Sequence, residues 1–302
     1  MLQQLGKLSY RLLTKRSKLK QLSLLVENGL PGNIVPCVNY LITREHDAQT
    51  KSIAQLAETR RADIAAQGQK KVPIWYSPMP NSVNEDTAQK LRPEPGETLF
   101  FTMERIAKTG KNETWGTVLY LLTKSFQSEV IIELGACAGI SAMYFASATS
   151  VKQLFTVEGS EELAKIANTS LQSYSNAIVV NSLFDDALDE HLPRLGQTID
   201  LAYIDGHHEK VATIHYFDKL LANLTPGAIV IFDDVSWSYD MREAWDTLSK
   251  RTEFCHAIDF GSIGVCIINN EHSEDNCIPQ YWNLQPIVGR HPIGKPHGWK
   301  SS

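Results

Sequence analysis

Acidic side chains close several short apolar segments of this chain of 302 residues. Glu158 and Asp205 each follow such a segment, and the pair Asp233 and Asp234 follows another. Ligands of an open parallel sheet bind beyond the carboxyl ends of its strands, so we expect these carboxylates at one edge. Asp205, Asp233 and Asp234 would repel one another and raise one another's pKa unless a cation lies among them. Because hard oxygen ligands suit Mg²⁺ or Ca²⁺, the set is compatible with a divalent metal site.

A glycine-containing loop follows the first of these apolar segments. Residues 130–141 are typical of a strand, a tight loop and a helix, with Glu133 at the end of the strand. Gly135 permits a turn with positive φ, and Gly139 lets the helix lie close to the strand. The middle glycine of the dinucleotide fingerprint is replaced by Cys137, which favours a nucleoside ligand without a pyrophosphate and disfavours a nicotinamide dehydrogenase. The alternative is an ordinary strand-to-helix turn.

Glu158 ends the second apolar segment, 25 residues after Glu133. An acid in that position commonly binds both ribose hydroxyls, because a carboxylate offers two acceptor oxygens. The alternative is an acid at the start of the helix expected from Ser160, stabilised by the helix dipole.

Composition limits the classes of protein that remain. The net charge is −5 and the pI is about 6.0, so nothing indicates a nucleic-acid partner. Five scattered cysteines without C-x-x-C spacing favour reduced thiols in a cytoplasmic protein over disulfides or a zinc site. No apolar run approaches the ~18 residues of a membrane-spanning helix, so none is expected.

Strand and helix patterns alternate from residue 130 onward. The expected strands, apolar on both faces like buried parallel strands, are 130–134, 154–157, 177–180, 199–204 and 228–232. The expected helices between and after them are 141–149, 160–174, 208–224 and 241–250. Residues 254–260 and 263–268 then predict a β-hairpin through Gly261. The pattern predicts an α/β fold: a doubly wound, mostly parallel, seven-stranded sheet with an antiparallel C-terminal hairpin.

The flanking regions have a different character. Residues 1–112 predict a mainly helical N-terminal region, with helices over 1–30, 44–66 and 98–108 and a long proline-containing loop over 77–97. We expect this region to supply substrate contacts, a lid or an oligomer interface. Its basic start favours a helix docked on this protein or on a second subunit, over a transit peptide or a membrane-surface helix. Residues 113–270 would form the ligand-binding domain, and 271–302 a polar surface tail.

Four motifs occur together between residues 115 and 268. They are ELGACAGIS from Glu133 to Ser141, TVE at 156–158, YIDGHH at 203–208 and LTPGAIVIFDD at 224–234. In this order and spacing they resemble class I S-adenosylmethionine-dependent methyltransferases; residues 1–112 are not covered. The resemblance implies that the glycine loop wraps the methionine part of S-adenosylmethionine, that Glu133 lies near its ammonium group and that Glu158 holds the ribose.

The implied cofactor-binding residues are Glu133, Gly135, Ala136, Cys137, Gly139, Ser141, Glu158, Gly159, Leu183, Phe184 and Asp205. The end of the third strand departs from the family, in which many members carry Gly-Asp-Ala there. Leu183 cannot accept a hydrogen bond from the adenine amine through its side chain. The adenine could instead be recognised by backbone groups or by Asp185.

The ends of the fourth and fifth strands resemble metal-dependent O-methyltransferases. The catechol and caffeoyl-CoA types have a lysine base three residues after the acid, whereas the macrolide-sugar type has a histidine there and Asp-Asp after the fifth strand. By this closer match His208 is the general base and Asp205, Asp233 and Asp234 bind the metal, with Mg²⁺ expected; His208 and Asp205 are the expected catalytic residues. An imidazole with a pKa near 6.5 accepts a proton at neutral pH, and a metal lowers the pKa of a bound hydroxyl.

Alternatives remain at these positions. Asp234 could only cap the helix expected near Ser238, and Asp233 could line the cofactor pocket without metal. Trp237 and Tyr239 could stack on a substrate or pack the loop against the N-terminal region. His207 is interpreted as a neighbour of the base, and His215 and His256 as structural.

The leading hypothesis is a divalent-metal-assisted O-methyltransferase acting on a small molecule, such as a natural-product hydroxyl, a sugar or a catechol. A second is a metal-independent O-, N- or carboxyl-methyltransferase with His208 as base. A third, of another class, is a cofactor-binding domain that serves as an interaction module. A homo-oligomer through the N-terminal helices is also expected.

Overall fold

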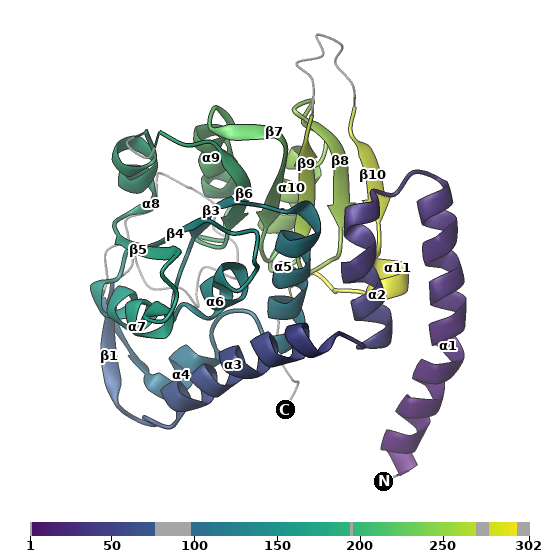
Figure 1. The fold of residues 1–302 in the computed structure, drawn as a ribbon, viewed down its shortest axis with the longest axis horizontal. Helices are drawn as coiled ribbons and strands as arrows, with labels where there is room; N and C mark the ends of the chain where they lie inside the picture. Colours follow the sequence, from purple (N-terminus) through teal and green to yellow (C-terminus); the bar gives the residue numbers. More distant parts are fainter. Residues whose placement is uncertain (1, 76–97, 194–195, 270–277, 295–302) are drawn as a thin grey trace.

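The computed structural model describes residues 2–75, 98–193, 196–269 and 278–294, with side chains from residue 14 onward (Figure 1). Its centre is an eight-stranded sheet in the order β10-β8-β9-β7-β6-β3-β4-β5. The strands are β3 (Val130–Leu134), β4 (Gln153–Glu158), β5 (Ala177–Asn181), β6 (Ile199–Ile204), β7 (Leu224–Phe232), β8 (Phe254–Asp259), β9 (Gly264–Ile268) and β10 (Gln280–Asn283). The strand order reverses between β3 and β6, as in a doubly wound fold.

Most of the sheet is parallel, and β9 is antiparallel to both of its neighbours, β7 and β8. This confirms the predicted fold class and its C-terminal hairpin. The eighth strand, β10, was not predicted; it pairs in parallel with β8 at the edge of the sheet. Trp282 is its one buried residue, so no apolar run marks this strand within the expected surface tail.

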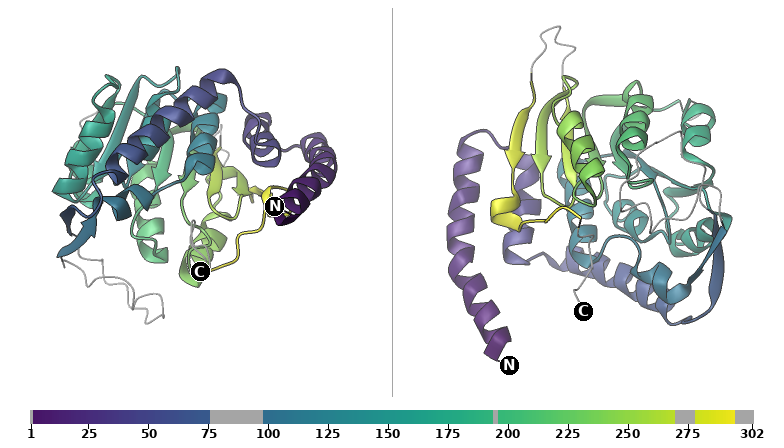
Figure 2. Two further views of the ribbon diagram at one scale, coloured as in Figure 1. Left: turned by 90° about the horizontal axis from the view of Figure 1, so that it is seen from below. Right: turned by 180° about the vertical axis from the view of Figure 1, so that it is seen from behind.

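Helices cover both faces of the sheet, as the two further views show (Figure 2). They are α5 (Glu113–Phe126), α6 (Ile140–Ala146), α7 (Glu161–Leu171), the short α8 (Phe184–Asp186), α9 (Lys210–Leu221) and α10 (Tyr239–Leu248). Successive strand residues point to opposite faces, so Ile131 belongs to the core under α5 and α6. Ile132 belongs to a second core, under α9 and α10. Strands buried on both faces explain the continuous apolar runs in the sequence.

The N-terminal region is mainly helical, as predicted, and consists of α1 (Leu2–Glu27), α2 (Val35–Thr43), α3 (Ala48–Ala65) and α4 (Met103–Lys108). The helix predicted for 98–108 is wrong in its first half, where β2 (Thr98–Thr102) pairs with β1 (Lys71–Trp75) in a separate two-stranded sheet. Alternate burial along β1, at Val72 and Ile74, shows why this pair forms. The loop predicted over 77–97 lies outside the described residues.

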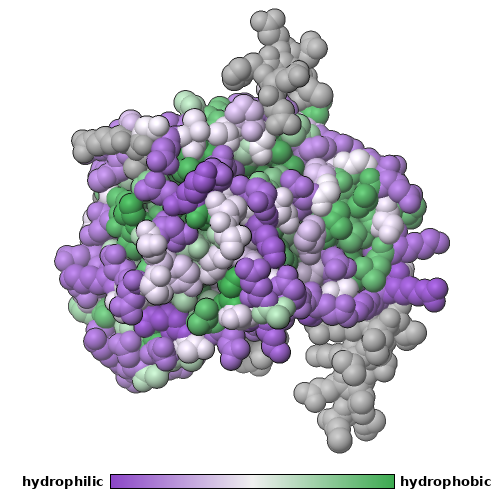
Figure 3. Space-filling model, in the orientation of Figure 1, coloured by the Kyte–Doolittle hydropathy of each residue, from purple (hydrophilic) through white to green (hydrophobic). Residues whose placement is uncertain are grey.

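Helix α1 extends along one side of the molecule, beside α2 and the short α11 (Gln285–Val288) (Figure 1). Leu22 is buried there, whereas Leu24 and Val26 are exposed. In the same view, Figure 3 shows hydrophobic side chains gathered on the surface where α1 and α2 lie. Across the described parts of the chain, no helix combines the length and the apolar character that a membrane span requires.

Candidate active site

The glycine loop leaves β3 in the geometry that the sequence predicts. Gly135 has a φ of +111°, and a Cβ atom there would lie 1.9 Å from the carbonyl oxygen of Asp205. Gly139 has a φ of +77° and packs against the backbone of Ala167. Cys137 also has positive φ, although it carries a side chain. The loop is therefore pressed directly against the end of β6, where the candidate base lies.

Glu133 is fully buried behind this loop. Its Oε2 atom accepts a hydrogen bond of 2.5 Å from the hydroxyl of Thr156. Its Oε1 atom makes no hydrogen bond of good geometry with the described residues, although the Ser141 hydroxyl is near enough to oppose the effect of burial on its pKa. Burial raises the pKa of Glu133 to about 7. A buried, unpartnered carboxylate oxygen requires a donor, so the site fits the ammonium group of S-adenosylmethionine.

Glu158 lies on the other side of the loop. Its carboxylate accepts hydrogen bonds from the backbone N–H groups of Cys137, at 2.8 Å, and Ser160, at 2.9 Å. Burial raises its pKa to about 7. Helix α7 begins at Glu161 with Ser160 as its N-cap, so Glu158 lies before the helix and is not one of its first-turn acids. Since each carboxylate oxygen has a further lone pair, these two bonds do not prevent Glu158 from also accepting ribose hydroxyls.

The end of β5 supplies an apolar surface rather than an acid. Leu183 contacts the Cβ position of Gly159, and the Phe184 ring leaves no room for a side chain at Gly206. Asp185, the alternative adenine acceptor, is held 2.6 Å from His215 and 2.8 Å from Lys219. Although burial opposes it, these two partners lower the pKa of Asp185. Its carboxylate is thus already paired, which leaves backbone groups as the simpler partners for adenine.

The three predicted carboxylates do converge at the ends of β6 and β7. The Tyr203 hydroxyl lies 2.7 Å from Asp233 Oδ2 and 3.0 Å from Asp205 Oδ2. Burial and the charge of Asp233 raise the pKa of Asp205 well above its usual range, against the opposing effect of Lys111. One hydroxyl proton can satisfy only one of the two contacts at a time, so the Tyr203 hydroxyl is shared between the two carboxylates.

Lys111 lies within this cluster and was not predicted from the sequence. Its side chain is 5% exposed; its ammonium forms salt bridges with Asp233 and, at 2.8 Å, with Asp234. Burial alone would lower the pKa of Lys111, but Asp233, Asp234 and Asp205 raise it above its usual value. The cation that the three carboxylates require is therefore provided, at least in part, by the chain itself.

His208 lies at the exposed edge of the cluster. Its Nε2 atom is 3.6 Å from Asp205 Oδ1 and 4.0 Å from Asp234 Oδ2, and its side chain is 26% exposed. The ring stacks on Trp237 at a centroid distance of 5.8 Å. Both His208 and His207 have positive φ, a backbone conformation uncommon outside glycine that often occurs at functional sites.

The structure also shows the contacts of neighbouring side chains for which the sequence allowed more than one role. His207 shares a 2.8 Å hydrogen bond with the Tyr216 hydroxyl, and its interpretation as a neighbour of the base stays a prediction. Ser238, not Asp234, caps α10 through the backbone N–H of Met241. Tyr239 is 70% exposed, so it does not pack the loop.

His291, from the C-terminal segment, was also missed. It is half-buried, close enough to Lys111 and Asp234 for their charges to act on it, and burial lowers its pKa. The adjoining Gly294 donates a backbone hydrogen bond to Ser236, beside the carboxylates. The expected surface tail therefore contributes to this wall of the site.

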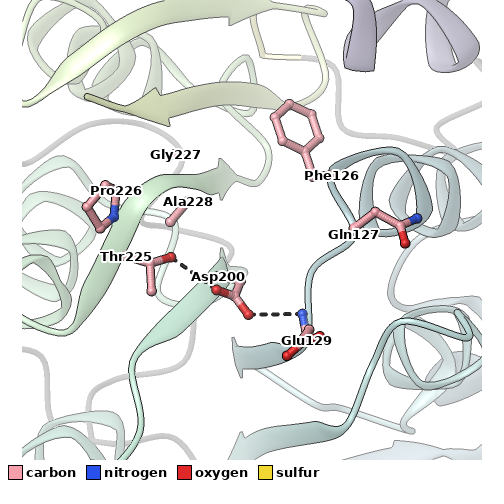
Figure 4. Close-up of a pocket in the computed structure, with 8 residues that line it drawn as sticks. All are labelled: Phe126, Gln127, Glu129, Asp200, Thr225, Pro226, Gly227 and Ala228. Atoms are coloured by element: carbon pink, nitrogen blue, oxygen red, sulfur yellow. Dashed lines mark hydrogen bonds between the residues drawn. The ribbon is translucent and has the colours of Figure 1, made fainter. Parts of the chain in front are cut away.

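A surface pocket lies at the opposite ends of the strands, where β3 and β6 begin (Figure 4). Asp200 accepts hydrogen bonds there from the backbone N–H groups of Glu129 and Val130 and from the hydroxyl of Thr225. These bonds tie three strands together and engage both carboxylate oxygens. The pocket is distant from the carboxyl ends of the strands, and we assign it no part in the chemistry.

Comparison with known proteins agrees with this geometry. Residues 132–235 match the family model of a methyltransferase domain, a segment that contains Glu133, Glu158, Asp205 and His208. The match agrees with the prediction of a methyltransferase domain over these residues. No curated protein matches the sequence.

Several solved structures show similarity to this chain. An O-methyltransferase from Bacillus cereus in complex with SAH is 17% identical, with 76% of this chain and 94% of that chain covered and a TM-score of 0.46. TomG, an O-methyltransferase from Streptomyces achromogenes involved in tomaymycin synthesis, solved in complex with SAM, is 17% identical, with 74% and 91% covered and a TM-score of 0.46. Cofactor-bound Rv0187 from MTB is 21% identical, with 54% and 84% covered and a TM-score of 0.45. Likenesses at this level carry no conclusion about the substrate.

Proposed function

We propose that this protein transfers the methyl group of S-adenosylmethionine to a hydroxyl of a small molecule. One observation carries the proposal: the loop that would hold the methyl donor touches the strand end that bears the candidate base. Gly135 lies against the backbone of Asp205, and the side chain of Asp205 faces His208. Donor, acceptor and base would therefore meet at one corner of the sheet.

The residues have distinct roles in this proposal. Glu133 receives the ammonium group of the cofactor, and Glu158 receives the ribose hydroxyls, alongside the loop formed by Gly135, Ala136 and Cys137. Gly139 and Ser141 position the start of α6 against this loop. Gly159, Leu183 and Phe184 form the apolar surface for adenine.

The chemistry needs a base because a neutral hydroxyl is a weak nucleophile. S-adenosylmethionine supplies an electrophilic methyl group, whose bond to sulfur breaks as the bond to oxygen forms. His208 accepts the hydroxyl proton in that step, and the neighbouring Asp205 stabilises the charged imidazole. Trp237 fixes the plane of the ring by stacking on it.

The charge of the site favours a hydroxyl acceptor over a carboxylate. Asp205, Asp233 and Asp234 provide three acidic groups against one ammonium, that of Lys111. A substrate carboxylate would be repelled there, and being ionised already it would need no base. This argues against the carboxyl-methyltransferase alternative.

Magnesium binding remains a prediction, and the residues predicted to hold the ion fit it poorly. Among the residues that the structure describes, no group of three or more His, Cys, Asp or Glu side chains is arranged to hold a metal ion. Asp233 and Asp234 instead turn carboxylate oxygens toward Lys111. Of the two mechanisms that the sequence left open, this arrangement favours the one without metal. A natural-product substrate, a homo-oligomer and a cytoplasmic location stay predictions.

Calorimetric titration of S-adenosylmethionine is the first test, followed by mass spectrometry of a panel of phenols, catechols and sugars incubated with the cofactor. We expect binding with one site per chain and a mass gain of one methyl group on a hydroxylated acceptor. Matched acceptors with the hydroxyl replaced by hydrogen are the control. Methylation of the matched amine or acid in preference to the hydroxyl would contradict the proposal.

A further inference from the structure

Lys111 occupies the place that a divalent cation would take in a three-carboxylate site. Its ammonium bridges Asp233 and Asp234 and lies near enough to Asp205 for the two charges to interact. With 5% of its side chain exposed, it is shielded from water almost completely. Lysine is seldom buried to this degree unless it is paired, so the arrangement is a specific feature of the site.

The backbone around Lys111 is held firmly. Arg61, on α3, donates hydrogen bonds to the carbonyl oxygens of Ala107, at 2.7 Å, and of Lys111 itself. On the far side, Asn112 caps α5 by accepting from the backbone N–H of Trp115. Gly110, with a φ of +84°, provides the turn between these anchors. The side chain is thus directed into the cluster by elements that are independent of the carboxylates.

An ammonium and a magnesium ion cannot share these oxygens. A magnesium ion requires carboxylate oxygens at about 2.0–2.1 Å in near-octahedral geometry. Asp233 Oδ1 and Asp234 Oδ1 are both directed at Lys111 Nζ, and Asp233 Oδ2 accepts from Tyr203. A dication placed among them would also face the repulsion of a buried positive charge a few ångströms away.

We propose that Lys111 is a built-in counter-ion that replaces the divalent metal, so that the site works without added metal. Lys111 is a positioning residue: it keeps Asp233 and Asp234 in place and leaves Asp205 to interact with His208. The proposal rests on the proposed function only where it concerns catalysis, because the occupancy of the carboxylate cluster can be measured on its own.

The test is a titration with Mn²⁺ alone, followed by electron paramagnetic resonance, on four proteins: wild type, Lys111→Ala, Lys111→Ala with Asp234→Asn, and Lys108→Ala. Lys108 is the matched control, since it lies in the same segment but is 72% exposed and pairs only with Glu104 in the described structure. We expect no stoichiometric Mn²⁺ site in the wild type or in Lys108→Ala. Lys111→Ala should create a site that binds Mn²⁺ at least tenfold more tightly than the wild type does. The added substitution Asp234→Asn should abolish that site.

Activity gives a second measurement. The wild-type rate should stay within twofold when the chelator EDTA is added, and Lys111→Ala should recover activity only with Mg²⁺ or Mn²⁺. A stoichiometric Mn²⁺ site in the wild type, no tighter in Lys111→Ala, would overturn the proposal, as would a wild-type rate that EDTA abolishes and Mg²⁺ restores. If Lys111→Ala does not fold, a stoichiometric Mn²⁺ site in the wild type is sufficient by itself to overturn the proposal.

Failure of the proposed function would look different. In that case no hydroxylated acceptor gains a methyl group under any metal condition, while the Mn²⁺ titrations still report whether Lys111 occupies the cluster. Cofactor calorimetry on each variant serves as the check that the glycine loop is intact.

Discussion

Two buried charge clusters lie near the carboxyl ends of the strands, and they differ in their balance of acidic and basic groups. In the first, Asp259 Oδ2 accepts from Arg242 at 2.8 Å, Tyr281 at 2.9 Å and Gln285 at 3.1 Å. Its Oδ1 accepts from the backbone N–H of Gly261. One carboxylate faces one guanidinium, and every lone pair on the Oδ2 side has a donor.

The second cluster contains Asp205, Asp233, Asp234 and Lys111, and it has more acids than cations. Burial and the excess negative charge of the cluster raise the pKa of Asp205, and His208 lies at the solvent-facing edge of the cluster. A balanced cluster holds elements together, in this case the C-terminal segment on α10. An unbalanced one holds protons that can be exchanged, which is what acid–base chemistry needs.

The largest expected effect is on turnover in the unbalanced cluster. His208→Gln removes the proposed base while keeping a polar side chain of similar reach, and kcat should fall by about 10²–10⁴-fold. Because the ring is 26% exposed and lies at the solvent-facing side of the cluster, the melting temperature and cofactor affinity should change little. Steady-state kinetics with calorimetry as the control measures both. A kcat within threefold of wild type would remove His208 from the mechanism.

The balanced cluster should show the opposite profile. Asp259→Asn leaves Arg242 buried without a full charge partner, and breaking such a pair destabilises a protein by about 3 kcal/mol. Turnover per folded molecule should be unchanged. Asp233→Asn is the matched variant, and it should be less destabilising because Asp234 continues to pair with Lys111. Urea unfolding of both variants decides; a larger loss for Asp233→Asn would contradict the comparison.

A smaller effect concerns pH and Glu133. Burial raises its pKa to about 7 from an ordinary value of 4.5, so the folded protein retains a proton that the unfolded chain has lost. Stability conferred by the protonated group is complete below pH 4.5 and is lost as the pH rises toward 7. Glu133→Gln should therefore stabilise the cofactor-free protein at pH 8, by at most about 3 kcal/mol, and have little effect near pH 4.5.

The measurement is the melting temperature of both proteins across that range, without cofactor. The same variant should bind S-adenosylmethionine more weakly, since the carboxylate proposed for the ammonium group is gone. An equal stability change at both ends of the pH range would show that Glu133 acts through packing instead.

The sequence predicted the sheet better than its surroundings. The runs 130–134 and 199–204 match β3 and β6 residue for residue, because strands buried on both faces leave uninterrupted apolar runs. Where burial alternates or is sparse, the prediction failed. Thr98–Thr102 was expected to be helical, and β10 was missed because Trp282 is its one buried residue.

The site was predicted in part for a similar reason. Each acid follows its own strand, so a local pattern places Asp205 and Asp233 at one edge. The need for a cation among them followed from charge alone. Its identity did not, because Lys111 is 123 positions from Asp234 and sits in a short polar loop that nothing local distinguishes. The sequence could state that a cation was needed there, but only the fold shows which one.

The edge formed by β10, α11 and the first two helices has a consequence for biosynthesis. The Gln280 side chain donates to the carbonyl of Asn28, and the two residues are 252 positions apart. At the roughly 5–20 residues per second of translation, the ribosome delivers this partner on the order of 10 to 50 s after α1 and α2. Throughout that interval the apolar face that includes Leu22 and Leu30 lacks its final cover. The nascent chain therefore passes through a long stage in which chaperone binding to these helices would be most effective.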